Sequence, residues 1–138
     1  MRGLLLDTSI PIGAERKGDD VWDALLKVRE RTGAQEIGVS TLTLMELAYG
    51  VARAETEARR TARQRFLSDV SHWADVYPVT EALATAAGMI EGELSLTGVR
   101  VAAVDLLIGM TARELGFAVA THNLRHFTRI PGLQVLSV

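Results

Sequence analysis

Short apolar runs alternate with helix-like segments along this chain, and this alternation constrains the fold more than any other feature. The runs at 3–7, 36–39 and 117–121 have the length and composition of buried strands. The segments at 19–31 and 80–98 repeat their apolar residues at helical spacing. Parallel strands need crossover connections, which are usually helices. We therefore predict an α/β fold in which a parallel sheet is flanked by helices in three layers.

The rest of the chain completes this pattern. Ser40 or Thr41 can cap a helix that runs to about Arg53. The other expected elements are helices at 56–73 and 104–115, a weak strand at 76–79 and an edge strand at 134–138. The apolar stripe of the helix that begins at Thr80 is expected to pack on the sheet. No repeat or low-complexity linker divides the chain, so we expect a single domain over residues 1–138.

Composition removes several classes of function. The chain has no cysteine, which excludes disulfides, thiolate metal sites and cysteine nucleophiles. No apolar run approaches the length of a membrane-spanning helix and no signal-peptide pattern follows Met1, so we expect a cytoplasmic protein without membrane contact. A formal net charge of −2 means that binding to nucleic acid would need a local patch or a metal ion. The arginine-rich segment 53–65 is interpreted as a solvated helix face.

Three acidic residues, Asp7, Glu46 and Asp105, each occupy an otherwise apolar stretch. An ionised carboxylate is costly in such surroundings unless it is paired, so three of them suggest that folding gathers them around a cation. Mg²⁺ or Mn²⁺ would offset their mutual repulsion, since both ions prefer hard oxygen ligands. Such an ion can polarise a phosphodiester and activate a water molecule for in-line attack. The pattern favours a metal-dependent phosphodiesterase.

Two of these acids also have structural interpretations. Asp7 is expected at the carboxyl end of the first strand, where open α/β sheets bind their ligands, but Asp7, Thr8 and Ser9 can also cap the next turn. Glu46 lies inside a helix, where capping does not explain it, although a surface ion pair with Arg53 would. The residues alone leave both alternatives open.

The third acid, Asp105, is expected in the first turn of a helix, where the helix dipole favours a negative charge. Gly109 and Ala112 share its helical face, so their small side chains are expected to leave room beside the carboxylate for an ion or a substrate. His122 and His126 have the i, i+4 spacing of a zinc site, but no third histidine or H-E-x-x-H motif accompanies them. We interpret both histidines as surface residues.

Four segments, LLLDTS, STLTLMELAYGV, VAAVDLLIGMTARELGFAVATHN and HFTRIPGLQVLSV, resemble in order and spacing the PIN-domain ribonucleases, most closely the VapC toxins of bacterial toxin–antitoxin pairs. The resemblance covers nearly the whole chain. It implies a PIN-like domain and an endoribonuclease with a Mg²⁺ or Mn²⁺ site built from Asp7, Glu46 and Asp105.

The same resemblance points to supporting residues and to two departures. The family usually has Thr-Asn after the first acid, whereas in this chain Ser9 follows Thr8, so the hydrogen bonding there should be altered but a hydroxyl can still orient the carboxylate. In the loop that reads T-x-N-x-x-D-F in the family, Thr121 and Asn123 are present but His126 replaces the residue that is often acidic. We expect Asn123 to complete the catalytic set through its amide oxygen or a bound water molecule, with Thr8, Ser9 and Thr121 in support.

Family members commonly cleave RNA, form homodimers and are inhibited by a cognate antitoxin that fills the acidic groove. The resemblance therefore implies RNA, an antitoxin and a second copy of the chain as partners. The helices over residues 42–73 carry Leu47, Tyr49, Phe66 and Trp73, more apolar side chains than one small core is expected to hide. Part of this surface is expected to bind an antitoxin helix or a second copy.

Two other function classes remain open. A phosphatase could use Asp7 as its nucleophile on a similar sheet, but that chemistry resembles a family with a second aspartate at the position of Ser9. Its later lysine is also missing, because Lys17 and Lys27 come too early. The other class is a catalytically inert PIN-like module that only binds a partner protein. Metal-dependent RNA cleavage that is lost on mutating the acids would distinguish the nuclease from both.

Overall fold

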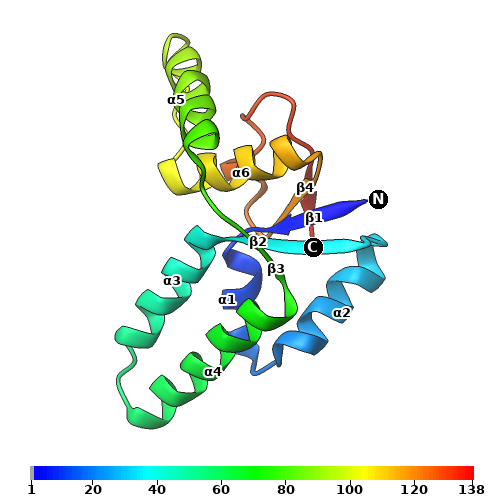
Figure 1. Ribbon diagram of the computed structural model, residues 1–138, viewed down its shortest axis with the longest axis vertical. Helices are drawn as coiled ribbons and strands as arrows, with labels where there is room; N and C mark the ends of the chain where they lie inside the picture. The colour runs from blue at the N-terminus through cyan, green and yellow to red at the C-terminus, as the bar shows by residue number, and fades with distance from the viewer. Residues whose placement is uncertain (1) are drawn as a thin grey trace.

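The computed structural model describes residues 2–138, which build one five-stranded sheet in the order β3-β2-β1-β4-β5 (Figure 1). The strands are β1 (Gly3–Leu6), β2 (Glu36–Ser40), β3 (Asp75–Tyr77), β4 (Ala118–Thr121) and β5 (Val135–Ser137). Every neighbouring pair is parallel, and Leu4 in the central strand lies opposite Ile37 on one side and Ala118 on the other. The predicted parallel sheet is confirmed.

Helices cover both faces of this sheet. They are α1 (Ser9–Lys17), α2 (Val21–Thr32), α3 (Thr41–Ala52), α4 (Glu57–Trp73), α5 (Glu81–Ser95) and α6 (Ala103–Leu115), with a short 3₁₀ turn, η1, at Leu124–His126. Figure 1 shows α1 to α4 on one side of the sheet and α5 and α6 on the other. This three-layer arrangement is the predicted one. None of the helices in residues 2–138 is long and apolar enough to cross a membrane.

The central strand explains why the sequence contains a continuous apolar run. Successive side chains of a strand point to opposite faces. Leu4 and Leu6 join the core under α1 to α4, and Leu5 joins the core under α5 and α6. All three are at most 3% exposed, because a sheet that is covered on both faces buries both sets of side chains.

Local capping explains where several helices begin and end. Ser40 caps α3 by accepting a hydrogen bond from Leu42 N–H at 3.0 Å, and Thr56 caps α4 through Arg59 N–H at 3.2 Å. Gly116 ends α6 with a φ of 70°, a left-handed conformation that glycine adopts without strain. These start and stop signals are within two residues of the predicted boundaries.

Two helices differ from the sequence predictions. The stretch after Asp7 is a full helix, α1, rather than a capped turn, and its buried Ile10 and Ala14 pack into the core. Pro11 is tolerated because it lies in the first turn, where a backbone N–H has no helical partner. The apolar stripe of α5 packs against α6 instead of the sheet, and most of α5 projects from the molecule (Figure 1).

The expectation that Gly109 leaves open space beside Asp105 is wrong. A Cβ atom at Gly109 would collide with the side chain of Ile130 and lie 3.1 Å from Leu133 Cδ2. Ala112 is also fully buried in the core. The small residues of α6 therefore allow the chain segment after η1 to pack closely against this helix, and they do not line an ion or substrate site.

Candidate active site

Asp7 lies immediately after β1, at the carboxyl end of the sheet, and is only 6% exposed. Its Oδ2 atom accepts hydrogen bonds from Ser9 Oγ at 2.6 Å and Thr121 Oγ1 at 2.9 Å, and a longer one from Ser9 N at 3.4 Å. The side-chain donors are the first residue of α1 and the last residue of β4, which lie far apart in sequence. The Ser9 hydroxyl therefore orients this carboxylate together with Thr121, whereas the Thr8 hydroxyl donates to Glu46 instead.

Glu46 projects from α3 toward the same edge. Its Oε1 atom accepts a hydrogen bond from Thr8 Oγ1 at 2.7 Å. Thr8 Oγ1 also lies 2.9 Å from Thr43 Oγ1, and since a hydroxyl has one proton, Thr43 must be the donor in that contact. Within residues 2–138 Arg53 forms no ion pair with Glu46, so the surface-pair interpretation is wrong.

Asp105 occupies the first turn of α6 with 21% of its side chain exposed, and its Oδ2 lies 3.2 Å from Nδ1 of His126. Burial raises the pKa of Asp105, and the negative charge of Asp7 raises it further. Glu46 acts in the same direction, while His126 opposes the shift. The three predicted acids are thus close enough to influence one another electrostatically.

The carboxylates come near one another without closing into a cage. Among residues 2–138, no group of three histidine, aspartate or glutamate side chains is gathered tightly enough to enclose a metal ion. Each acid nevertheless has one oxygen held by the protein, and hydrogen bonds from the described residues leave Asp7 Oδ1, Glu46 Oε2 and Asp105 Oδ1 without a donor. No buried side-chain polar atom in that part of the chain lacks a partner, so Asp7 Oδ1 must be reached by solvent.

This donor set suits a partly hydrated hard cation. Mg²⁺ keeps several of its own waters and is usually bound through one or two carboxylates, so a tight protein cage is not needed. Asp7 Oδ1, Glu46 Oε2 and Asp105 Oδ1 meet that requirement, because the protein holds the other oxygen of each carboxylate and leaves these three without a hydrogen-bond donor.

The loop after β4 places Asn123 at the edge of the site. Its backbone N–H donates to Thr121 Oγ1 at 2.9 Å, so it belongs to the same network as Asp7. The amide side chain is exposed and forms no hydrogen bond to any residue that the structure describes. Its expected role in the catalytic set stays a prediction.

The two histidines of this loop face different partners. His126 is 54% exposed and contacts Asp105, whereas Nδ1 of His122 lies 2.9 Å from the carbonyl oxygen of Val138. They do not form a pair, in agreement with the interpretation as surface residues. The position that is often acidic in the family is thus occupied by His126, whose imidazole contacts the Asp105 carboxylate.

One residue beside the site escaped the sequence analysis. Arg63 Nη1 donates to the carbonyl of Gly50 at 2.7 Å, and its Nε lies 3.6 Å from Oε1 of Glu15. Arg63 and Glu46 line the same pocket of about 120 Å³. Arg63 therefore joins α4 to α3 and α1, unlike the solvated arginine that was expected. Only its contacts in the fold distinguish it from neighbouring arginines.

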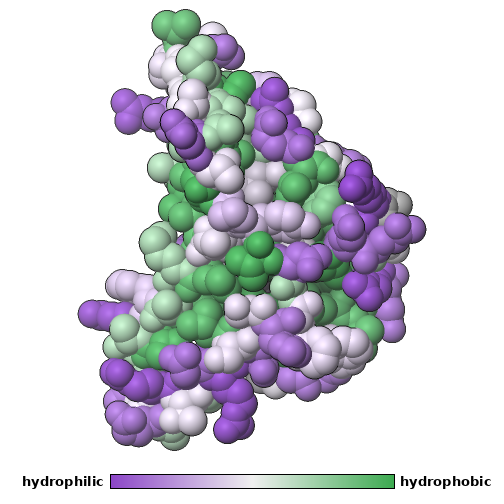
Figure 2. Space-filling model, viewed as in Figure 1, coloured by the Kyte–Doolittle hydropathy of each residue, from purple (hydrophilic) through white to green (hydrophobic). Residues whose placement is uncertain are grey.

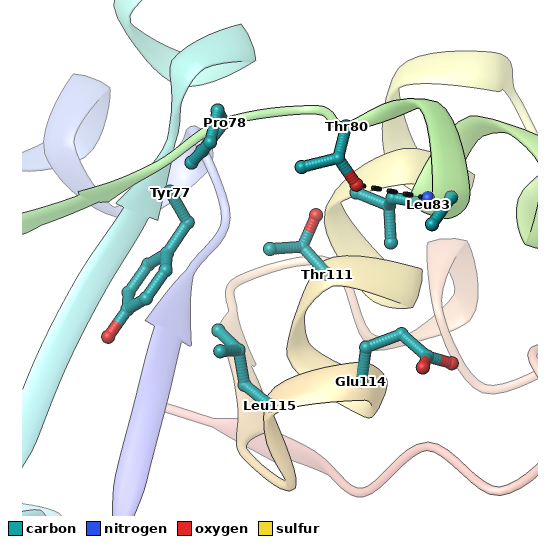
Figure 3. Close-up of a pocket in the computed structure, with 8 residues that line it drawn as sticks. Tyr77, Pro78, Thr80, Leu83, Thr111, Glu114 and Leu115 are labelled. Atoms are coloured by element: carbon teal, nitrogen blue, oxygen red, sulfur yellow. Dashed lines mark hydrogen bonds between the residues drawn. The ribbon is translucent and has the colours of Figure 1, made fainter.

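A larger pocket lies away from the carboxylates. It has a volume of about 270 Å³, and Tyr77, Thr111 and Leu115 are among its lining residues (Figure 3). Thr80 caps α5 at its edge by accepting from Leu83 N–H at 3.1 Å (Figure 3). None of the predicted site residues lines it.

Comparisons with known proteins agree with this geometry. A family model of the PIN domain matches residues 4–133. The tRNA(fMet)-specific endonuclease VapC of Shigella flexneri is 36% identical over 97% of this chain and 96% of that protein, and ribonuclease VapC1 of Rickettsia felis is 31% identical over 99% and 96%. The fold is similar to a solved structure of DNA-bound VapBC from Salmonella typhimurium, with a TM-score of 0.77 and 29% identity over 99% of this chain and 98% of that one. The chain belongs to the PIN-domain family and, within it, to the VapC ribonucleases.

Proposed function

We propose that this protein is a metal-dependent endoribonuclease that acts as the toxin of a toxin–antitoxin pair. The observation that carries the proposal is the meeting of Asp7, Glu46 and Asp105 at one edge of the sheet, each with one oxygen oriented by the protein. The names of the VapC relatives support the ribonuclease activity. No observation supports the phosphatase alternative.

Asp7, Glu46 and Asp105 would hold Mg²⁺ or Mn²⁺ through their solvent-facing oxygens. When bound, the ion would polarise the scissile phosphodiester and lower the pKa of a water molecule that attacks it. Ser9 and Thr121 fix the direction of Asp7, and Thr8 fixes that of Glu46. Asn123, whose backbone N–H donates to Thr121, would use its exposed side-chain amide to hydrogen-bond a water molecule or a phosphate oxygen.

The substrate is proposed to be RNA. Initiator tRNA is the first RNA to test, because a relative that is 36% identical is named for that substrate. Burial raises the pKa of Asp105, and the negative charges of Asp7 and Glu46 raise it further. The same charges repel phosphates at the metal-free edge, so we expect the ion to strengthen RNA binding and to be required for cleavage.

Two protein partners are proposed. The similar structure from Salmonella typhimurium is a VapBC complex, which supports an antitoxin partner, and a cationic antitoxin side chain would be attracted to the three carboxylates. Figure 2 shows apolar surface between the projecting α5 and the helices on the other side of the sheet. Tyr49 and Met45 on α3 are 68% and 55% exposed, and Met89 on α5 is 65% exposed. These side chains suit a second copy of the chain or an antitoxin helix.

The predicted protein-binding surface on residues 42–73 is smaller than expected. Leu47 and Phe66 are only 9% exposed and belong to the core, so they are not available to a partner. Tyr49, at 68%, and Trp73, at 48%, are exposed. Of the four apolar residues expected to bind a partner, only Tyr49 and Trp73 are therefore proposed to do so.

The proposal is tested by incubating the purified protein with initiator tRNA in Mg²⁺, in Mn²⁺ and in excess EDTA. We expect cleavage with either metal, none in EDTA, and none with Asp7→Asn, Glu46→Gln or Asp105→Asn. Asp23→Asn, an exposed acid in the first turn of α2, is the matched control and should cleave like the wild type. Full activity in EDTA would overturn the metal mechanism. Hydrolysis of small phosphate esters without RNA cleavage would favour the phosphatase, and no hydrolysis at all would favour the inert module.

A further inference from the structure

A second charged feature lies next to the carboxylates. The structure contains a pocket of about 220 Å³ between α1, α2 and the loop after β4. Three cationic side chains line it, namely Lys17, Lys27 and Arg31, together with His122 and a single acidic side chain, Asp19. Both lysines of the chain are therefore in this one pocket, although the molecule as a whole has a formal charge of −2.

The positive charge of the pocket is largely uncompensated. Asp19 is engaged by Lys27, whose Nζ lies 3.2 Å from Oδ2 of Asp19. Lys17 and Arg31 form no ion pair with any residue between 2 and 138, and both side chains are exposed. Cations that stay exposed and unpaired around a hollow are available to an anionic ligand.

The pocket and the carboxylates share a wall. His122 lines the pocket, and its backbone N–H donates to Ser9 Oγ at 3.2 Å. The Ser9 hydroxyl in turn donates to Asp7 Oδ2 at 2.6 Å. Gly13 allows the imidazole to lie close to α1, since a Cβ there would be only 3.3 Å from His122 Nε2. Ser9 and His122 therefore connect the Asp7 carboxylate to the lining of the basic pocket.

We propose that this pocket binds a backbone phosphate of the RNA substrate that flanks the scissile bond. The inference rests on the proposed ribonuclease function and names the surface that holds the substrate. Three carboxylates attract a cation but repel a polyanion, so part of the affinity for RNA must come from basic side chains nearby. Arg31 can bind a phosphate through two N–H groups, while the lysines act as mobile point charges. His122 marks the boundary with the catalytic edge.

The test compares Lys17→Ala/Arg31→Ala with the wild type by fluorescence anisotropy of a labelled single-stranded RNA oligonucleotide. The measurement is made in EDTA over a series of KCl concentrations, so that binding is read without cleavage. Each lost phosphate contact reduces the slope of log affinity against log salt by about 0.7 for single strands, so the double variant, which loses the one proposed contact, should lose about 0.7. With metal, KM for initiator tRNA should rise while kcat changes little, because the pocket lies outside the reacting atoms.

Arg29→Ala/Arg59→Ala is the control, because it removes the same charge from exposed arginines that do not line the pocket. Lys17→Glu/Arg31→Glu should weaken RNA binding more than the alanine pair, and melting temperatures near that of the wild type would show that both variants fold. If the wild type cleaves RNA but the alanine pair has the slope and KM of the control, the pocket is not an RNA subsite. Loss of antitoxin binding with unchanged RNA affinity would assign it to a protein partner and overturn the inference. A wild type that neither binds nor cleaves RNA would refute the proposed function itself.

Discussion

Thr121 is the residue at which the orientation of Asp7 can be tested most cleanly. It is fully buried, and its hydroxyl donates to Asp7 Oδ2 at 2.9 Å and accepts from Asn123 N–H at 2.9 Å. Thr121→Val keeps nearly the same shape and removes only the hydroxyl. A hydrogen bond to a charged group contributes about 1.5–3 kcal/mol, and exposed Asn123 can turn to water, so we expect a loss of about that size in the free energy of unfolding.

Urea denaturation in EDTA measures this loss, and Thr111→Val is the matched control. Thr111 is also buried, but its hydroxyl donates to the neutral carbonyl of Leu107 at 2.7 Å, a bond that contributes about 0.5–1.5 kcal/mol. Because Thr121 holds a proposed metal ligand from behind, its valine variant should also bind Mn²⁺ about 10- to 100-fold more weakly, while Thr111→Val should not. Equal losses of stability in the two variants, or unchanged Mn²⁺ affinity in Thr121→Val, would refute the orienting role.

Three further predictions follow from the same contacts. An acid with a raised pKa binds its proton more tightly in the folded state, so its contribution to stability is greatest below the ordinary pKa and is lost as the pH rises through the folded pKa. Asp105→Asn should therefore be at least as stable as the wild type at neutral pH without metal. Thermal melts should show this advantage disappearing in acid. His126→Ala should raise the pKa of Asp105 further, because the imidazole lowers it, and a carboxyl ¹³C NMR titration measures the change. Gly109→Ala should cost about 1–3 kcal/mol in urea denaturation, because its Cβ collides with Ile130, whereas Gly88→Ala on α5 meets nothing within 4 Å and should cost no stability.

Much of the fold could be predicted because local signals and long-range requirements agree in this chain. The apolar run at β1 needs cover on both faces, and Ser40, Thr56 and Thr80 each provide the cap that begins a helix. The positions of Asp7 and Asp105 also follow from local rules, since one ends a buried strand and the other lies in a first helical turn.

The remaining features depend on contacts between distant segments. Nothing in the sequence near α5 distinguishes packing on α6 from packing on the sheet, since both present apolar surface. Gly109 looked like open space because the segment that fills it, around Ile130, comes later in the chain. Arg63 was missed for the same reason, because its partners lie on other helices, and the pocket lined by Lys17 and Arg31 was missed because distant segments of the chain form it together.

The measurement that tests the central claim most directly is calorimetric titration of Mn²⁺ into the wild type and into Asp7→Asn, Glu46→Gln and Asp105→Asn. If the three carboxylates share one ion, each substitution should weaken the same binding event, while Asp23→Asn should leave it unchanged. The wild type should also lose its RNA cleavage when that ion is removed and regain it when Mn²⁺ is restored. Wild-type Mn²⁺ affinity in all three variants would contradict a shared metal site at this edge of the sheet.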